Sequence, residues 1–146
     1  MTDETDCIFC KILAGELEVS LVYQDDVCSA FMDIQPVNPG HLLIVPNNHA
    51  AYLGELKEEE GAQMFRVGQR LAAALRESGV KCEGVNLFLA DGEAAMQEVF
   101  HVHLHVFPRY REDGFRLKFA PTYFQKPERR ELSEIAEKIK NVLKAE

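Results

Sequence analysis

The chain has 146 residues, of which 47% are hydrophobic and 27% charged, proportions that fit one globular domain with a buried core. Its net charge of −8 argues against a general binder of nucleic acids or anionic membranes. Because no apolar run approaches membrane-spanning length and the acidic N-terminus is unlike a signal sequence, we expect a cytoplasmic protein that acts without a membrane.

Apolar periodicity predicts three helices and five strands along the chain. A polar N-terminus, residues 1–6, is expected to be frayed, and a short helix follows over residues 7–13. The longest amphipathic pattern predicts a helix over 58–78, ended by Gly79. A terminal helix is predicted over 127–146, with Pro127 at its start. The predicted strands are 19–24, 27–32, 41–45, 85–90 and 100–109.

The predicted strands follow one another in hairpin and meander order. This order, with two substantial helices, favours an α+β fold with an antiparallel sheet. We predict a single domain over residues 1–146.

The stretch from Phe100 to Arg109 alternates polar and apolar residues, which predicts a strand with two different faces, ended by Pro108. The core-facing side chains are Val102, Leu104 and Val106. The other face carries His101, His103 and His105. A lone histidine on a strand is most often a satisfied polar residue, but three parallel imidazoles repel one another once charged. The row therefore indicates a metal, an anion or proton transfer.

The segment from Gln97 to Arg109 (Gln-Glu-Val-Phe-His-Val-His-Leu-His-Val-Phe-Pro-Arg) closely resembles the signature of the histidine-triad (HIT) proteins. The resemblance covers about Cys7 to Arg109, and more weakly the terminal helix. It implies the HIT-like fold, a five-stranded antiparallel sheet with a long helix and a C-terminal helix, usually assembled as a homodimer. It also implies binding of a nucleotide or nucleotide conjugate, expected to be a purine, and hydrolysis or transfer at its α-phosphate.

The resemblance also assigns roles within the triad. His103 is the expected nucleophile, since neutral imidazole attacks phosphorus without prior deprotonation, and the nucleotidyl-histidine that forms is cleaved by water. His105 would hold a non-bridging oxygen of the α-phosphate, and His101 would stand beside the nucleophile. Gln97 would donate to phosphate or leaving-group atoms, with a loop-capping amide as the alternative.

Residues 31–41 resemble the nucleoside side of the same family. Asp33 is expected to accept hydrogen bonds from the ribose hydroxyls, and its alternative is a residue that starts a turn. Phe31 and Ile34 would wall the base, with core packing as the alternative. His41 is expected to form a hydrogen bond behind the triad without touching substrate.

The segment before the triad departs from the family pattern. Many bacterial members read Asn-x-Gly-x-x-Ala-Gly-Gln there, where this chain reads Ala-Asp-Gly-Glu-Ala-Ala-Met-Gln. Ala90 removes an amide that members direct at the phosphate, and Met96 replaces a glycine. Glu98 adds a negative charge near the leaving group, where it would disfavour polyanions. These changes bear on efficiency and substrate preference.

A metal site is expected from the ligand set Cys7, Cys10, His49 and His101. A Cys-x-x-Cys pair alone is a weak signal, and its alternative is two reduced thiols. The complete Cys₂His₂ set matches that of the related galactose-phosphate uridylyltransferases and of several bacterial HIT proteins. Four protein ligands leave no open position, so we expect one structural zinc per chain that orients His101.

The sequence leaves three interpretations of the function. The first is a nucleotide hydrolase or transferase that uses His103. The second is a low-turnover protein that senses nucleotides or binds a partner. The third is a zinc-binding interaction module in which the triad is a ligand strand. A homodimer is expected from the resemblance and from apolar residues in excess of one helix face, Met64, Phe65 and Val67.

Overall fold

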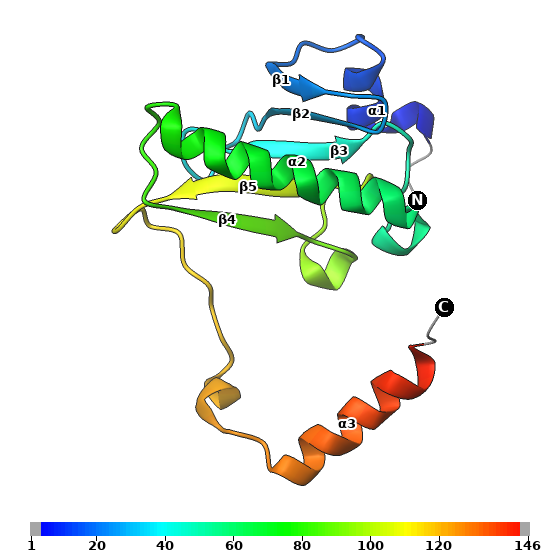
Figure 1. Cartoon of the computed structure of the whole chain (residues 1–146), viewed down its shortest axis with the longest axis vertical. Helices are drawn as coiled ribbons and strands as arrows, with labels where there is room; N and C mark the ends of the chain where they lie inside the picture. Colours follow the sequence, from blue (N-terminus) through cyan, green and yellow to red (C-terminus); the bar gives the residue numbers. More distant parts are fainter. Residues whose placement is uncertain (1–3, 144–146) are drawn as a thin grey trace. The chain divides into compact units, whose positions relative to one another are not determined.

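The computed structural model describes residues 4–143, which divide into two compact units on either side of Gly114 (Figure 1). The first unit contains the sheet and two α-helices. The second contains a short 3₁₀ helix, Pro121–Phe124, and the terminal helix α3, Arg129–Val142. The prediction of a single domain over 1–146 stays a prediction. Within the described residues, none of the helices combines the length and apolar character that crossing a bilayer requires.

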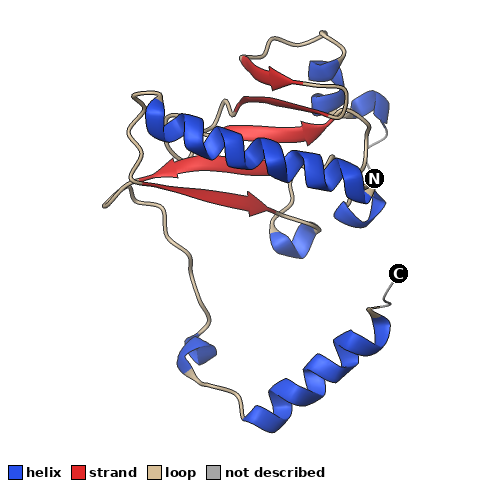
Figure 2. Ribbon diagram, in the orientation of Figure 1, coloured by secondary structure: helices blue, strands red, loops and turns tan. Residues whose placement is uncertain are grey.

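The five strands form one antiparallel sheet in the order β1-β2-β3-β5-β4 (Figure 2). This confirms the predicted α+β fold and five-stranded antiparallel sheet. Because β5 pairs with β3 on one side and β4 on the other, the last triad histidine lies inside the sheet. The strands are β1 Leu21–Gln24, β2 Cys28–Met32, β3 Leu42–Pro46, β4 Gly84–Leu89 and β5 Leu104–Arg109.

Two helices pack on the sheet of the first unit. The long helix α2, Glu58–Glu77, crosses one face (Figure 1), and the short helix α1, Ile8–Leu13, packs at the other. Glu4–Asp6 form an exposed 3₁₀ helix and residues 1–3 lie outside the described part, so the fraying of residues 1–6 stays a prediction. The end of the predicted terminal helix, 144–146, also lies outside it. Two further 3₁₀ helices are Leu53–Glu55 and Glu93–Ala95.

Strand β3 is buried on both faces of the sheet, which explains its unbroken apolar sequence. Leu42 and Ile44 belong to the core under α2. Leu43 and Val45 belong to a second core on the opposite face, which contains Phe9 of α1. The two cores enclose the strand next to the triad, and they fix its position from above and below.

Helix α2 uses most of its apolar residues within its own unit. Met64 and Val67 are both only 1% exposed, whereas Phe65 is 56% exposed. The expected excess of apolar surface on this helix is therefore wrong for two of its three residues, because both are needed to cover the sheet. The homodimer stays a prediction.

The triad is not carried by one regular strand, in contrast to the sequence prediction. Strand β5 begins only at Leu104, and the preceding residues bond to the end of β3 and to the loop that follows it. The N–H of Val102 donates to the carbonyl of Ala50 at 2.8 Å, and the ring of His101 reaches the carbonyl of Pro46. The predicted inward face is nevertheless buried, at Val102, Leu104 and Val106.

Pro108 lies within β5, so the prediction that it ends the strand is wrong. Its carbonyl accepts a hydrogen bond from Nδ2 of Asn38 at 2.9 Å. In an antiparallel strand the N–H and C=O of a residue point to the same side. The missing N–H therefore faces the Asn38 loop, beyond the last pairing of β5 with β3, and no ladder bond is lost.

Asp25 ties the β1–β2 turn to helix α2. Its Oδ1 accepts from the backbone N–H groups of Val27 and Cys28 at 2.7 and 2.8 Å. Its Oδ2 accepts from the hydroxyl of Tyr23 at 2.6 Å and from Nε2 of Gln63 on α2 at 2.8 Å. Burial opposes the charged form, but these donors outweigh it and hold the pKa of Asp25 well below its usual range.

We predict that Asp25→Asn lowers the free energy of unfolding by about 1–3 kcal/mol, the range for lost hydrogen bonds to a charged group. Because the folded pKa is depressed, the contribution is complete above the unfolded pKa of about 4 and is lost as pH falls. Urea unfolding at pH 7 and at pH 3 measures both effects. The neighbouring exposed Asp26→Asn is the control, and equal unfolding curves for the two variants at pH 7 would contradict the prediction.

Candidate active site

His103 has one free ring nitrogen, and the backbone determines which. Its Nδ1 lies 2.8 Å from the carbonyl oxygen of His101. Since a carbonyl only accepts, Nδ1 carries the proton and Nε2 keeps its lone pair. The ring is 6% exposed, and the edge of Phe9 packs against it with 5.2 Å between ring centroids. A fixed tautomer in a shielded position is the arrangement that a nitrogen nucleophile requires.

His101 is oriented in the same way by a second carbonyl. Its Nε2 donates to the carbonyl of Pro46 at 2.9 Å, so Nδ1 is the nitrogen that keeps a lone pair. That nitrogen lies 3.3 Å from Sγ of Cys7, 3.5 Å from Sγ of Cys10 and 3.2 Å from Nδ1 of His49. The ring of His101 thus faces the two cysteines, while its backbone carbonyl accepts a hydrogen bond from the ring of His103.

His105 is contacted from behind by His41. The Nε2 of His41 lies 2.8 Å from Nδ1 of His105. The ring of His41 is 3% exposed, and this is the position that the sequence predicted, behind the triad. His105 is also close to His103, with 4.9 Å between ring centroids, so the two imidazoles share one small site.

All three triad imidazoles are neutral at pH 7. Burial lowers the pKa of His101 and of His105 to about 4, with a smaller contribution from neighbouring histidines. Burial also lowers the pKa of His103, although the His101 carbonyl, Asp33 and Glu98 oppose it. Neutral rings do not repel one another, so the close row is stable and retains lone pairs for chemistry.

The predicted ligand set comes together at one point. The donor atoms of Cys7, Cys10, His49 and His101 all lie within 4.8 Å of one another. Bonds of about 2.0–2.3 Å in a tetrahedron separate its ligands by roughly 3.3–3.8 Å. The Sγ of Cys10 lies 3.3 Å from Nδ1 of His49, and the other distances to His101 fall near the same range. The residues present therefore fit a four-coordinate metal ion.

The thiol of Cys10 favours its neutral form in the absence of a cation. Burial, with the hydrogen bond and charge of Cys7, raises the pKa of Cys10 to about 12. A bound cation reverses this preference, because a coordinating thiol is deprotonated. The amide N–H of Cys10 also points at Sγ of Cys7, at 3.4 Å, and would stabilise a thiolate there.

Gln97 is buried, and its amide is fully used by backbone groups of its own loop and of the loop that follows β3. Nε2 donates to the carbonyls of Ala51 and Val99 at 2.7 and 3.1 Å. Oε1 accepts from the N–H of Gly92 at 2.7 Å. Both amide hydrogens are thus committed, and the geometry favours the loop-capping alternative over a donor to phosphate.

Met96 occupies a left-handed backbone conformation, with φ of 70°. This region favours glycine, the residue that the resemblance places there, and it is strained for methionine. The side chain is 71% exposed, so it projects from the loop. The segment therefore keeps this backbone conformation without the glycine. Ala90, in contrast, is buried and has no side-chain amide.

Asp33 starts a turn and also faces the histidines. Its Oδ1 accepts from the N–H of Gln35 at 2.8 Å, and its Oδ2 lies 3.5 Å from Nε2 of His41. The turn-starting interpretation is therefore satisfied. Each carboxylate oxygen accepts more than one hydrogen bond, so this turn leaves acceptor capacity for hydroxyl groups.

The two residues expected to wall a base lie in different environments. Phe31 is 2% exposed and packs against Phe9, with 5.7 Å between ring centroids. Ile34 is 97% exposed. The geometry favours the core-packing alternative for Phe31, while Ile34 offers an open apolar side chain next to Asp33.

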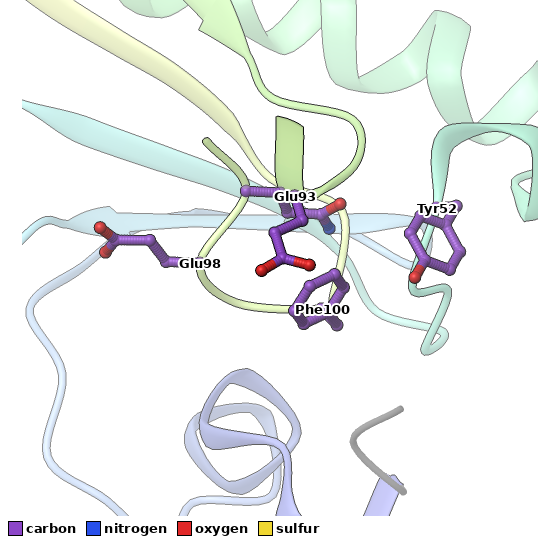
Figure 3. Close-up of a pocket in the computed structure, with 5 residues that line it drawn as sticks. Tyr52, Glu93, Glu98 and Phe100 are labelled. Atoms are coloured by element: carbon purple, nitrogen blue, oxygen red, sulfur yellow. The ribbon is translucent and has the colours of Figure 1, made fainter. Parts of the chain in front are cut away.

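A cavity of about 560 Å³ opens beside Gln97, and its other lining residues are Tyr52, Glu93, Glu98 and Phe100 (Figure 3). Tyr52 and Phe100 meet edge to face, with 5.8 Å between centroids. Three of the lining residues were missed by sequence reasoning: Tyr52, Glu93 and Phe100. Tyr52 comes from the loop after β3, whereas Glu93 and Phe100 belong to the β4–β5 connection, and nothing in the local sequence marks Tyr52 as their neighbour.

The five-stranded antiparallel sheet, with one triad histidine in β5 and two just before it, has the arrangement expected of the histidine-triad class. A family model described as the HIT domain matches residues 14–112. An uncharacterized HIT-like protein of Borreliella burgdorferi is 40% identical over 114 residues, 77% of this chain and 82% of that protein. The chain belongs to the HIT family.

Two relatives have names that state an activity. The adenosine 5'-monophosphoramidase of Schizosaccharomyces pombe is 32% identical over 139 residues, 94% of this chain and 98% of that protein. An adenylylsulfatase of Arabidopsis thaliana is 35% identical over 112 residues, 77% of this chain and 56% of that protein.

Solved structures agree with the fold. The crystal structure of a HIT family member from Bacillus subtilis has a TM-score of 0.88 at 35% identity and covers 97% of this chain and 99% of its own. A zinc-bound histidine triad protein from Mycobacterium smegmatis has a TM-score of 0.74 at 39% identity, and covers 82% of this chain and 86% of its own.

Proposed function

We propose that the protein is a nucleotidyl hydrolase or transferase that acts at the α-phosphate of a nucleotide conjugate through a covalent intermediate on His103. The observation that carries the proposal is the bond from Nδ1 of His103 to the carbonyl of His101, because it leaves Nε2 free. The names of the relatives from Schizosaccharomyces pombe and Arabidopsis thaliana support the reaction class.

The reaction takes two displacements at phosphorus. In the first, the Nε2 lone pair of His103 bonds to the α-phosphorus, and the bond to the leaving group breaks with its electron pair on that group, which takes up a proton. In the second, water bonds to phosphorus and loses a proton, and the P–N bond breaks to return its pair to Nε2. The sum is addition of one water, or of another acceptor in a transfer.

Two side chains hold the substrate in this proposal. His105 donates to a non-bridging oxygen of the α-phosphate, and Asp33 accepts from the ribose hydroxyls with its remaining lone pairs. A purine base and a homodimer, which the family resemblance implies, and a cytoplasmic location, which the sequence led us to expect, belong to the same proposal.

The leaving group is expected to be uncharged or cationic. Glu93 and Glu98 line the cavity beside Gln97, and Glu98 also acts electrostatically on His103. A polyphosphate leaving group would bring several negative charges to these carboxylates. An amine leaving group carries no such penalty, whereas the carboxylate released from an acyl conjugate brings one negative charge.

A low-turnover protein that senses nucleotides or binds a partner is the second candidate. Two observations favour it. Both N–H donors of the Gln97 side chain bond to backbone carbonyls, and Ala90 has no side-chain donor. Such a site would bind a nucleotide and have few donors left to stabilise the charge that develops in the transition state.

We also propose that Cys7, Cys10, His49 and His101 hold one structural zinc per chain. The donor set and its spacing support zinc, as does the zinc-bound relative from Mycobacterium smegmatis. With four protein ligands the ion has no open position, so its contribution is to fix the His101 ring, and with it the carbonyl that orients His103.

His103→Ala is predicted to abolish turnover of an adenosine phosphoramidate while AMP binding is retained, since the ring supplies the nucleophile and other groups hold the nucleotide. Turnover is followed by release of AMP, and binding by calorimetry. Leu132→Ala, on α3, is the control for general effects of substitution. A near wild-type rate for His103→Ala would overturn the covalent route.

Asp33→Ala is predicted to weaken AMP binding by about 1–3 kcal/mol, the cost of a lost charged hydrogen bond. Asp33→Asn separates the two roles, because its amide oxygen still accepts from Gln35 but has no charge for the ribose. Both variants should bind AMP and 2′,3′-dideoxy-AMP with similar affinity. If the wild type already binds the two nucleotides equally, Asp33 is a turn residue only.

Cys7→Ser is predicted to remove the zinc and to lower the midpoint of thermal unfolding, because metal-binding energy is folding energy. Elemental analysis of protein grown with zinc should give one ion per chain in the wild type and a large loss in the variant. Cys82→Ser, at a half-exposed thiol outside the group, should keep its metal. A wild-type protein without metal would remove the proposal.

A further inference from the structure

We propose that the backbone N–H of Val37 decides, through the ring of His41, which nitrogen of His105 carries its proton. His41 is then a positioning residue, because it acts on the substrate only through His105. The consequence for substrate rests on the proposed function, in which His105 holds an oxygen of the α-phosphate. The tautomer itself does not depend on that function.

The first link is the contact between Val37 and His41. The amide nitrogen of Val37 lies 2.9 Å from Nδ1 of His41. A backbone N–H only donates, so Nδ1 must present a lone pair. In a neutral imidazole the proton then resides on Nε2. A doubly protonated ring would turn an N–H toward the N–H of Val37, and burial in any case lowers the pKa of His41.

The second link is the direction of the proton on Nε2 of His41. Nδ1 of His105 lies 2.8 Å from it, and Oδ2 of Asp33 lies 3.5 Å away. The shorter contact is the hydrogen bond. His105 therefore accepts at Nδ1, and its own proton lies on Nε2. That N–H is the only one its ring has to donate.

The loop that carries Val37 is anchored from outside the site. Asn38, 4% exposed, donates through Nδ2 to the carbonyl of Pro108 at 2.9 Å and to Oδ2 of Asp113 at 2.8 Å. The N–H of His41 donates to the carbonyl of Asn38 at 3.1 Å, which closes a turn. Gly40 has φ of +105°, and a Cβ there would lie 2.9 Å from Val80.

These anchors hold a backbone donor in a fixed direction toward His41. An amide N–H cannot ionise or change its role with pH, unlike a carboxylate or an imidazole. It therefore imposes one tautomer on His41 and, through it, on His105. With the opposite tautomer, His105 would present a lone pair to a negatively charged phosphate oxygen, and the contact would be repulsive.

The same atoms could be mistaken for a cation site. One donor atom each of Asp33, His41 and His105 lies within 4.8 Å of the others. A cation bound there would require a lone pair on Nε2 of His41. The Val37 N–H places a proton on that nitrogen, so the relay and a cation site exclude each other in this geometry.

Two amide substitutions at His41 test the relay. In His41→Gln the side-chain NH₂ reaches the place of Nε2 and still donates to His105. In His41→Asn the NH₂ stops near the place of Nδ1 and does not reach. Long-range ¹H–¹⁵N spectra of ¹⁵N-labelled histidines, recorded on the zinc-loaded protein, report the protonated nitrogen of each ring. Thermal unfolding and AMP binding check that each variant is folded.

We expect the wild type and His41→Gln to show His105 protonated at Nε2, and His41→Asn to show a mixture of tautomers. The kcat should fall about tenfold to a hundredfold in His41→Asn, the range for losing a partner that orients a histidine, and His41→Gln should recover most of it. AMP binding should change less than kcat. A wild-type His105 protonated at Nδ1, or an unchanged tautomer in His41→Asn, would overturn the relay.

The backbone donor is tested by replacing the Val37 amide with an ester, introduced as the α-hydroxy analogue of valine. This removes one N–H and leaves every side chain in place. We expect the spectrum of His41 to change from Nδ1 unprotonated in every molecule to a mixture in which some rings carry the proton on Nδ1. An unchanged His41 spectrum would contradict the role of Val37.

Zn²⁺ added beyond the first equivalent tests the cation site. A stoichiometric change at both His41 and His105 would replace the relay by such a site. If the wild type turns over no conjugate, the proposed function fails while these spectra still decide the relay.

Discussion

The carbonyl oxygen of His101 is the atom on which the candidate active site depends. It accepts a hydrogen bond from the N–H at Nδ1 of His103, and the lone pair of Nε2 is therefore left free. Its own position is set by the ring of the same residue, which donates to the Pro46 carbonyl and faces the two cysteines with its other nitrogen. One residue therefore joins the candidate metal ligands to the proposed nucleophile, with its side chain used for one and its backbone for the other.

The fold supplies the partners of this residue through the sheet order. The end of β3 provides the Pro46 carbonyl, and the loop after β3 provides His49 and the Ala50 carbonyl. Because β5 is inserted next to β3, the segment before β5 passes along this loop. Both faces of β3 are buried, so packing holds the Pro46 end of this central strand in place. The triad segment is irregular because it bonds to a loop, and this irregularity lets its two N-terminal histidines make different contacts.

A common physical principle governs the three triad histidines. Burial removes their charge, and groups of fixed hydrogen-bonding direction then choose the protonated nitrogen in each neutral ring. Carbonyls choose it for His101 and His103, and an amide N–H chooses it for His105 through His41. Backbone groups suit this task because their position follows from the fold and their protonation does not vary.

Much of the fold and of the site membership could be predicted from the sequence. Alternation and turn residues placed every strand within a few residues, and the family resemblance anticipated the group of Cys7, Cys10, His49 and His101 that the structure brings together. Contacts between distant loops could not be predicted.

Gln97 illustrates this limit, because its donors meet the carbonyls of Ala51 and Val99, and only the folded loop makes the first of these a neighbour. The start of β5 was misplaced for the same reason, since alternation does not reveal that Val102 pairs with a loop. Phe31 and Ile34 are both apolar in sequence, yet one is in the core and the other in solvent.

The central claim is that the reactive atom is Nε2 of His103, selected by the His101 carbonyl. It is tested most directly by trapping the intermediate in protein whose histidines carry ¹⁵N. An acid-free quench during turnover of an adenosine phosphoramidate, followed by peptide mapping, locates the adenylyl group. Coupling between ³¹P and ¹⁵N then identifies the nitrogen. We predict one adenylyl group on Nε2 of His103. An adduct on Nδ1 or on another residue would contradict the selection of Nε2 by the His101 carbonyl.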